Sequence, residues 1–371
     1  MRSAVGIVTG VGEIANKVRI GIVGAGWWST QHHIPGLLAY PAAEVVGVAD
    51  RDPSKLGAVA RTYGLKGLFS DHREMLQKAQ PQGVIIAVPH AFHYPIARDV
   101  LQAGVSAMVE KPMTLRGEEA WDLVNLARER GVHLTVGYPW NYTRHARAAR
   151  EAVRRGEIGN IQLVSGLFAS MVIEYFRGNP EAYRGVFKFP VTGPNKDTYS
   201  DPSVAGGGQA HLQVTHYAGL MFWVTGLRAV EVFAYMENHD VKVDLVDAIS
   251  LRFDNGALGV IGSTGGTAPG QRQDHELRIY GTKGSIIMDP NQGTLSIHPA
   301  VGEPRIFENL GGEEIYPAEA TGRNLVDVLA GTAETSAPGE LGATVVEMLD
   351  AAYRSSRDGR KAEVRQRVSA S

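Results

Sequence analysis

The first third of the chain alternates short apolar runs with longer segments in which apolar residues recur at helical spacing. Such runs are typical of strands buried on both faces, and their alternation with helices predicts a mostly parallel sheet covered by helices. The predicted strands are 18–23, 44–50, 66–69, 83–88, 105–109 and 133–136. The predicted helices are 31–40, 53–63, 71–79, a segment that ends at 103, and 116–130.

After about residue 144 the pattern changes to one helix, 144–155, and then to longer strands in which polar and apolar residues alternate. These strands are 161–169, 229–236, 246–253, 257–262 and 276–280. Turn sequences at 254–256 and 281–284 join neighbouring strands, which predicts an open, mostly antiparallel sheet. Further helices are expected at 209–224, 320–329 and 341–355.

These patterns predict an α/β protein with two domains. Residues 18–140 form the domain with the parallel sheet. Residues 141–371 form an α/β domain with the antiparallel sheet, and its last helix can pack back on the first domain. Residues 171–204 form a long, proline-containing loop, and loops of this length are usually functional, for example as a substrate lid. Residues 1–17 are expected to be a disordered leader, since glycines interrupt their apolar stretch.

Composition narrows the class of partner. Lys and Arg number 37 against 39 Asp and Glu, which leaves no basic field for nucleic acid or an anionic membrane. No apolar run approaches the roughly 20 residues of a membrane-spanning helix. There are 0 Cys, which excludes disulfides, thiolate metal sites and a cysteine nucleophile and suits a reducing cytoplasm. We therefore expect a cytoplasmic protein that acts on a small polar molecule.

The first strand ends at Gly24-Ala25-Gly26, and a segment able to form a helix follows. Strand, glycine turn and helix in this order form the phosphate-binding unit of a Rossmann domain. Small residues let the backbone approach a pyrophosphate, and the helix N-terminus offers unpaired N–H groups. The third glycine of the usual pattern is Ser29 here. Trp27 and Trp28 could stack on a dinucleotide or pack as aromatic support under the turn.

Asp50 ends the second strand, close to where a Rossmann unit places the carboxylate that binds the adenosine ribose. A carboxylate accepts hydrogen bonds from the ribose hydroxyls and repels a 2′-phosphate, which favours NAD over NADP. The neighbouring Arg51 argues the other way, because a guanidinium could bind that phosphate. Asp50 could instead cap the helix that follows the Asp52-Pro53 turn.

Five residues that directly follow predicted strands collect at one edge of the parallel sheet: Gly24, Asp50, Pro89, Lys111 and Tyr138. Ligands of such sheets bind at the carboxyl ends of the strands, so the convergence indicates a binding site. An ammonium there could donate to a substrate hydroxyl or, when neutral, accept its proton, which makes Lys111 a catalytic candidate. The alternative is a surface lysine paired with Glu110.

A second catalytic candidate, His216, lies on the predicted helix 209–224. Gln209, Leu212, Gln213 and His216 share one face of that helix, and the polar members stand among apolar neighbours. Such a stripe indicates a face that lines a cavity, although a core histidine bonded to the backbone would have the same spacing.

Two further histidines, His90 and His93, lie at the end of the strand 83–88. They could contact a nicotinamide ribose or cap the next helix. His211, near the start of the helix 209–224, lies off the polar stripe and is undecided. No acidic cluster accompanies the histidines, and no metal site is expected.

Taken together, these motifs resemble the glucose–fructose oxidoreductase / inositol dehydrogenase / rhizopine-catabolism (Gfo/Idh/MocA) family, over roughly residues 18–359. The resemblance rests on seven features: the glycine turn, Pro89 with His93, Glu110-Lys111-Pro112, Gly137-Tyr138, Gly156-Glu-Ile-Gly159, Gly206-Gly207-Gly208 ahead of His216, and the hairpin 281–284.

The resemblance implies an N-terminal Rossmann domain, a C-terminal domain whose open sheet forms a homodimer or homotetramer interface, and hydride transfer between a nicotinamide cofactor and a carbinol. It implies that Lys111 and His216 exchange the hydroxyl proton. The expected cofactor site comprises Gly24, Gly26, Trp27, Trp28, Asp50, Arg51, Pro89, His90, His93, Glu110 and Lys111. The expected substrate site comprises Lys111, Tyr138, Gln209, Gln213 and His216.

Three departures from the family's pattern concern the substrate. Leu212 stands where the family usually carries an Asp, Asn141 stands where many members carry an Arg, and His90 replaces a frequent Asn. Leucine can neither polarise His216 nor bind a hydroxyl, so Gln213, Gln209 or His211 could substitute for the Asp. These changes argue against the usual inositol or glucose substrate.

The sequence thus predicts an NAD-dependent oxidoreductase that acts on a CH–OH group of a sugar, glycoside or polyol. One alternative keeps NAD tightly bound and recycles it, oxidising a glycoside at carbon 3 so that elimination or epimerisation can follow. A second alternative is a cofactor-binding regulator without catalysis, which only Leu212 favours.

Overall fold

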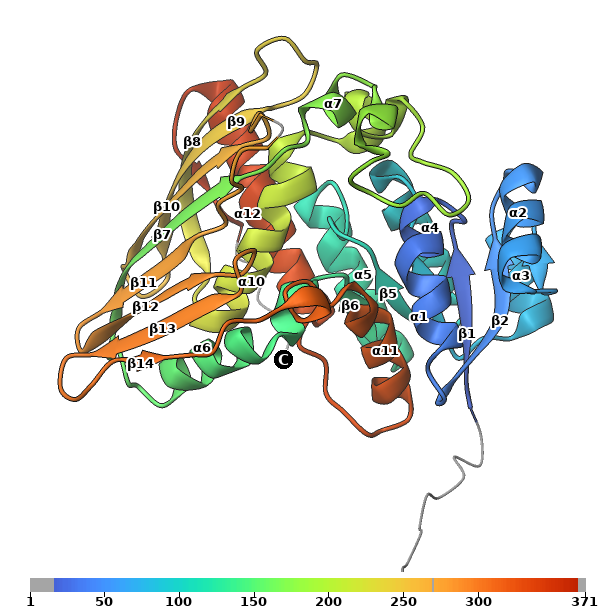
Figure 1. The fold of residues 1–371 in the computed structure, drawn as a ribbon, viewed down its shortest axis with the longest axis horizontal. Coiled ribbons are helices and arrows are strands. Elements are labelled where there is room, and N and C mark those ends of the chain that lie inside the picture. The colour runs from blue at the N-terminus through green and yellow to red at the C-terminus, as the bar shows by residue number, and fades with distance from the viewer. Residues whose placement is uncertain (1–16, 269, 366–371) are drawn as a thin grey trace, which may run out of the picture.

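The computed structural model describes residues 17–268 and 270–365, and the chain in these ranges builds two sheets (Figure 1). The expected leader, apart from Lys17, lies outside the described residues. The first sheet has six parallel strands in the order β3-β2-β1-β4-β5-β6. The second has nine strands in the order β14-β13-β12-β11-β7-β10-β9-β8-β15. The architecture is α/β, with a Rossmann-like sheet followed by a mixed, mostly antiparallel one.

The first sheet follows the apolar pattern of the sequence. Its strands are β1 (Val18–Val23), β2 (Ala43–Ala49), β3 (Leu68–Phe69), β4 (Gly83–Ile86), β5 (Ser106–Val109) and β6 (Leu134–Val136). Its helices are α1 (Ile34–Leu38), α2 (Pro53–Tyr63), α3 (His72–Ala79), α4 (His93–Gln102) and α5 (Gly117–Arg130). The strand order reverses between β1 and β4, and the carboxyl ends on either side of this point open a crevice for a ligand.

Two turns of π-helix replace parts of the expected helices. One, η1 (Ser29–His33), precedes α1, and the other, η5 (Ala210–Val214), precedes α10 (Thr215–Thr225). A π turn contains one residue more than an α turn and occurs frequently at functional sites. In this chain η5 contributes Leu212 and Gln213 to the lining of the cavity described below, and η1 directly follows Trp28, which also lines it.

The second sheet packs its inner face on helices and leaves its outer face open. Its strands are β7 (Ile161–Ala169), β8 (Ala229–Glu237), β9 (Val246–Phe253), β10 (Leu258–Thr264), β11 (Leu277–Gly281), β12 (Gly284–Asp289), β13 (Thr294–Pro299), β14 (Arg305–Ile306) and β15 (Ala362–Glu363). The pair β7–β10 is parallel, and every other pair in this sheet is antiparallel. The sequence did not predict four of these strands, which are β12, β13, β14 and β15. Figure 1 shows α10 and α6 (Arg144–Arg154) against the inner face.

The last helices join the two sheets. Helix α11 (Ala318–Leu329) packs on the first sheet, where Gly83 leaves room for Leu325 and Leu329. Helix α12 (Gly339–Asp358) contacts α5 and β6 as well as β8 and α10. The C-terminal segment thus returns to the first sheet.

The segment expected as a long loop contains short helices: α7 (Ile173–Phe176), η4 (Pro180–Tyr183), α8 (Asp197–Ser200) and α9 (Pro202–Ala205). We call residues 171–205 the lid segment, because it extends from the second sheet across to the first. Tyr175 and Phe187 lie on its inner side. Within the described residues, no helix combines the length and apolarity needed to cross a bilayer.

Candidate active site

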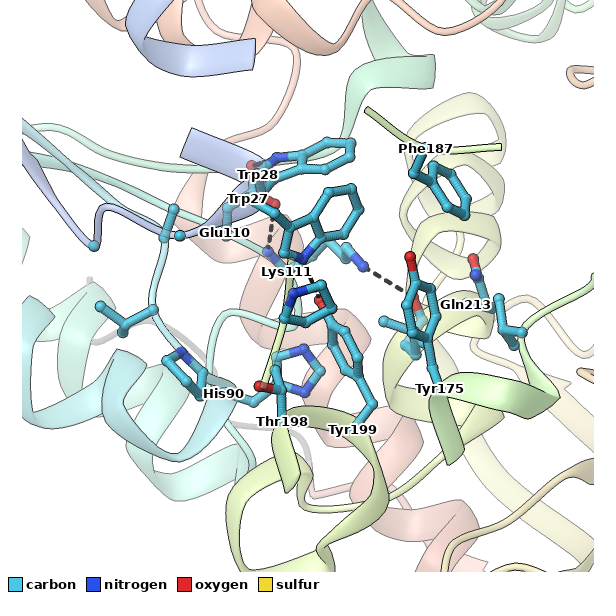
Figure 2. A pocket seen from close by; sticks show the side chains of 18 of the residues that line it. Trp27, Trp28, His90, Glu110, Lys111, Tyr175, Phe187, Thr198, Tyr199 and Gln213 are labelled. Atoms are coloured by element: carbon cyan, nitrogen blue, oxygen red, sulfur yellow. Dashed lines mark hydrogen bonds between the residues drawn. The ribbon is translucent and has the colours of Figure 1, made fainter. Parts of the chain in front are cut away.

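A cavity of about 340 Å³ lies between the carboxyl ends of the first sheet, the helix α10 and the lid segment. Figure 2 shows Trp27 and Trp28 on one side of it and Tyr175, Phe187 and Gln213 on the other. The lining contains most of the side chains expected from the sequence: Gly24, Gly26, Trp27, Trp28, Asp50, Pro89, His90, His93, Glu110, Lys111, Gln213 and His216. Three expected site residues, Arg51, Tyr138 and Gln209, do not line it.

The glycine turn is shaped by two glycines with different roles. Gly24 has a φ of +102°, and a Cβ there would collide with the carbonyl oxygen of Ala87, so the fold itself requires glycine. A Cβ on Gly26 would meet no protein atom within 4 Å, so the backbone at that position faces open space. A pyrophosphate could approach it there.

Asp50 is tied to this turn. Its Oδ2 accepts a hydrogen bond of 2.7 Å from Ala25 N–H, and its Oδ1 accepts one of 2.9 Å from Asp52 N–H. Each carboxylate oxygen keeps a further lone pair, and Asp50 lines the cavity, so ribose hydroxyls could bind there. The helix α2 is capped by Asp52 instead. The two roles that the sequence left open for Asp50 therefore belong to different residues: Asp52 caps α2, and Asp50 holds the glycine turn.

Arg51 lies away from the cavity. Its guanidinium carbon stands 5.0 Å from the centre of the Phe92 ring, and the side chain is exposed. The side chains of Asp50 and Arg51 point in different directions, and only that of Asp50 lines the cavity. The geometry thus offers a carboxylate, and no guanidinium from Arg51, to the ribose of a dinucleotide.

Glu110 is the buried centre of the cofactor side. Its Oε1 lies 2.9 Å from His33 Nε2 and accepts a bond of 2.8 Å from Trp28 Nε1, and its Oε2 accepts one of 3.2 Å from Lys111 N–H. Burial raises the pKa of Glu110, but the hydrogen bond from His33 and the charge of Lys111 outweigh it and hold that pKa below its usual range. A Cβ at Gly137 would lie 2.7 Å from Glu110 Oε2, so glycine is needed there.

Lys111 extends from the end of β5 to the helix that carries His216. Its Nζ donates a hydrogen bond of 2.9 Å to the carbonyl oxygen of Leu212, inside the π turn η5 (Figure 2). Burial lowers the pKa of Lys111 to about 8, against the opposing charge of Glu110. At neutral pH a measurable fraction of this amine is uncharged, as general base catalysis requires.

His216 also lines the cavity. Its Nε2 lies 3.4 Å from Tyr316 Oη, which is a long hydrogen bond. Burial lowers the pKa of His216 well below its usual value, and the charge of Lys111 lowers it further. The imidazole is therefore neutral, and it can accept or donate one hydrogen bond at the cavity.

His90 and His93 are more constrained than the sequence suggested. The Nδ1 of His90 lies 2.9 Å from the carbonyl oxygen of Ala205, at the end of the lid segment. Both ring nitrogens of His93 contact backbone oxygens, those of Pro112 at 2.7 Å and Val88 at 2.8 Å. These histidines hold loops around the cavity.

Two expected substrate residues lie in the core. Tyr138 is 1% exposed, packs against Gly219 of α10, and has its Oη 3.4 Å from Thr215 Oγ1. Gln209 is fully buried and bonds Ser170 and Ser263 of the second domain. The π turn Ala210–Val214 lies between Gln209 and His216 and has more residues per turn than an α-helix. The glutamine is therefore rotated away from the face that the α-helical spacing predicted.

A group of aromatic residues at the cavity was not assigned from the sequence. Its members come from separate elements and are Trp140, Phe168, His275 and Tyr316. Tyr316 lies in the segment that leads into α11. No local spacing relates the other three, since each is brought in by the tertiary fold.

The lid segment closes on the glycine turn through Trp27. The indole Nε1 donates to Tyr199 Oη at 3.3 Å, and the ring lies 5.7–6.4 Å from those of Tyr175, Phe187 and Phe189. Trp27 is thus packed by the lid, whereas Trp28 bonds Glu110. Within residues 17–268 and 270–365, no group of three or more His, Asp or Glu side chains is arranged to hold a metal ion.

Comparison with known proteins gives matches over both parts of the chain. Residues 18–138 match the model of the GFO/IDH/MocA oxidoreductase family with an NAD-binding Rossmann fold, and residues 146–287 match the C-terminal domain model of the same family. An uncharacterized oxidoreductase of Synechocystis sp. is 27% identical over 309 residues, which are 78% of this chain and 77% of the relative.

Two further relatives have named activities or ligands. The dTDP-3,4-didehydro-2,6-dideoxy-alpha-D-glucose 3-reductase of Streptomyces violaceoruber is 31% identical over 156 residues, 42% of this chain and 45% of the relative. The crystal structure of GenD2 from gentamicin A biosynthesis, in complex with NAD, has a TM-score of 0.77 and 26% identity and covers 97% of this chain and 100% of that one.

Proposed function

The chain belongs to the Gfo/Idh/MocA family of NAD-dependent oxidoreductases, and we propose that it acts on a CH–OH group of a sugar, glycoside or polyol. The observation that carries the proposal is the buried Lys111, which shares one cavity with His216 and with the residues suited to NAD. When bound, NAD takes up or returns the hydride of the carbinol carbon.

In the oxidation direction, the uncharged amine of Lys111 accepts the proton of the reacting hydroxyl. The hydrogen bond from Nζ to the Leu212 carbonyl fixes the amine toward α10, and the neutral His216 holds the same hydroxyl oxygen from the helix. In the reduction direction, the protonated Lys111 returns the proton. Leu212 contributes its backbone carbonyl oxygen to this arrangement, and the chemistry of its side chain does not affect that contribution.

Replacement of Lys111 by Ala tests this assignment. We expect kcat to fall by about 10²- to 10⁴-fold, the range typical for loss of a general acid–base group. NAD binding, measured by titration of tryptophan fluorescence, should persist, because the glycine turn and Asp50 are unchanged. Retained turnover would remove Lys111 from the chemistry, and NAD binding without oxidation of any polyol or glycoside by the unmodified protein would favour the regulator.

A second candidate function, in which NAD stays bound and is recycled, is supported by the lid segment. Its aromatic contacts with Trp27 and the bond between His90 and Ala205 would have to open before the cofactor could leave. This function predicts NAD in the purified protein and no accumulation of NADH absorbance while the glycoside is converted. The dTDP-sugar 3-reductase among the relatives is consistent with chemistry at carbon 3 of a hexose.

We also propose that the second sheet forms a homodimer or homotetramer interface. Apolar side chains on neighbouring strands gather on its outer face, and they are Leu163, Leu167, Leu258, Val260 and Tyr280. Exposed contiguous patches of this kind mark interaction surfaces. A double change, Leu258→Lys with Val260→Lys, should yield monomers in sedimentation velocity, and an unchanged oligomer would place the interface elsewhere.

A further inference from the structure

One side of the cavity is formed by a group of rings, which we call the aromatic wall: Trp140, Phe168, His275 and Tyr316. The Phe168 and His275 rings are stacked with centroids 4.0 Å apart and planes at 22°. Trp140 lies 5.4 Å from His275 and stands nearly perpendicular to Tyr316 at 5.9 Å. The wall is therefore one packed unit rather than four separate side chains.

This wall adjoins the reacting position. The ring of His216 lies 5.8 Å from Trp140 and 5.9 Å from Tyr316. A substrate held between Lys111 and His216 must therefore place whatever its reacting ring carries against these aromatic faces. Aromatic faces favour apolar and aromatic groups, which stack on them.

Polar atoms on the wall lack partners within the protein. Both ring nitrogens of His275 and the Nε1 of Trp140 are buried and make no hydrogen bond in the part of the chain that the structure describes. Burial lowers the pKa of His275, and the nearby backbone of Ala169 partly opposes this shift. These nitrogen atoms are buried and do not face the cavity, so the wall offers a ligand mostly apolar ring surface.

The charge of the cavity limits that ligand further. Its charged lining residues are Asp50, Lys55, Glu110 and Lys111, and no arginine is present among the described residues that line it. All four belong to the first domain. A phosphate or carboxylate on the group that meets the wall would be buried against neutral rings without a cation, which is unfavourable.

We propose that the substrate is an uncharged glycoside whose aromatic aglycone lies on the aromatic wall while its sugar ring reacts between Lys111 and His216. The inference rests on the proposed function, because it uses the reacting position to orient the sugar. It differs from a free monosaccharide substrate, which would leave the wall uncovered, and from a sugar nucleotide, whose diphosphate would lack a cation.

The test compares matched glycosides with the protein as purified, supplied with NAD. Phenyl and methyl glycosides of glucose and galactose, in both anomers, and glucose 6-phosphate are incubated separately, and the oxidised sugars are quantified by mass spectrometry. This readout does not depend on free NADH. We expect kcat/KM for the preferred phenyl glycoside to exceed that of its methyl counterpart by at least about 10-fold, the discrimination typical of an apolar pocket. Glucose 6-phosphate should not be oxidised at a measurable rate.

The variant Phe168→Leu sharpens the comparison. Loss of the stacked ring should reduce the ratio of phenyl to methyl kcat/KM toward one. The matched control Phe233→Leu, on β8 and outside the cavity, should leave both rates unchanged. An equal ratio in the unmodified protein, or a preference for the phosphorylated sugar, would overturn the proposal whatever the variant does.

A binding measurement separates this proposal from the proposed function. The Lys111→Ala protein, loaded with NADH, is titrated with phenyl and methyl glycosides and followed by tryptophan fluorescence. Preferential binding of the phenyl compound without oxidation by the unmodified protein would support the wall and refute the catalytic function. Oxidation of methyl and phenyl glycosides at equal kcat/KM would do the reverse.

Discussion

The two ends of the cavity are built in opposite ways. At the glycine turn, the polar atoms that shape the site are bonded to one another over short distances: Asp50 holds the turn, and Glu110 holds Trp28 and His33. At the aromatic wall, rings from four separate segments of the chain pack against one another. The difference teaches that hydrogen bonds shape the cavity beside the glycine turn, whereas ring packing shapes it at the wall.

The glycine turn and the aromatic wall also differ in which side chains are charged. Glu110 is stabilised in its charged form, and Lys111 titrates near pH 8 between the two ends. The histidines of the wall side, His216 and His275, are kept neutral by burial, which lowers the pKa of His275 to about 4. A charged group is therefore stabilised beside the glycine turn, whereas no opposite charge would stabilise one at the aromatic wall.

The largest effect should come from the glycine turn. Gly24→Ala forces a side chain into a left-handed backbone and against Ala87, so we expect a clear loss of thermal stability and at least about 100-fold weaker NAD binding. Gly26→Ala should leave the melting temperature of the NAD-free protein unchanged, since no protein atom lies near its Cβ. Its affinity for NAD should still fall about 10- to 100-fold, or about 1.4–2.7 kcal/mol. Isothermal titration and thermal melts of both variants make the comparison. Unaltered NAD binding by Gly26→Ala would show that the cofactor does not approach this turn.

The next effect is the pH dependence of the reaction. Because oxidation needs the uncharged Lys111, kcat/KM should rise about 10-fold per pH unit up to the pKa near 8 and then level off. Reduction needs the charged form, so its rate should fall above that pH. Lys111 faces the carboxylate of Glu110 and the imidazoles of His90, His93 and His216, whose pKa values are lowered by burial and add no inflection near 8. A flat oxidation profile between pH 6 and 9 would contradict this assignment.

A smaller effect links the cofactor end to Lys111. The charge of Glu110 raises the pKa of Lys111, so Glu110→Gln should move the inflection of the oxidation profile to lower pH, by roughly one unit. The amide can still accept from Trp28, which keeps the fold. The exposed Glu129→Gln on α5 serves as a control and should not shift the profile. A shift to higher pH would mean that Glu110 does not act on Lys111 through its charge.

The smallest effect concerns the choice of cofactor. Arg51 stacks on Phe92 outside the cavity, so Arg51→Ala should change the Kd for NAD by less than about twofold and should not alter discrimination against NADP. Fluorescence titrations with both cofactors measure this. Loss of NADP binding in the variant alone would show that the guanidinium reaches the ribose.

The parallel sheet and the cofactor end could be predicted because their signals are local. Strand β1, the glycine turn and Asp50 are each recognised within a few residues, and a parallel sheet brings the carboxyl ends of its strands to one edge. The same logic placed Lys111 among the candidates, and the helical spacing of polar residues placed His216 there. It extended too far for Tyr138, which also follows a strand but is directed into the core against Gly219.

The sequence by itself thus determined the fold class and the order of the sheets, and it named most of the residues that line the cavity beside the glycine turn, because hydrogen bonds and apolar periodicity act over short stretches of chain. Only the tertiary structure decided that a π turn removes Gln209 from the cavity, that Lys111 bonds the Leu212 carbonyl, and which rings form the aromatic wall. These contacts join segments that are distant in the sequence, or they depend on the number of residues in one helical turn. No local pattern encodes them, because their geometry exists only after the two sheets have packed together.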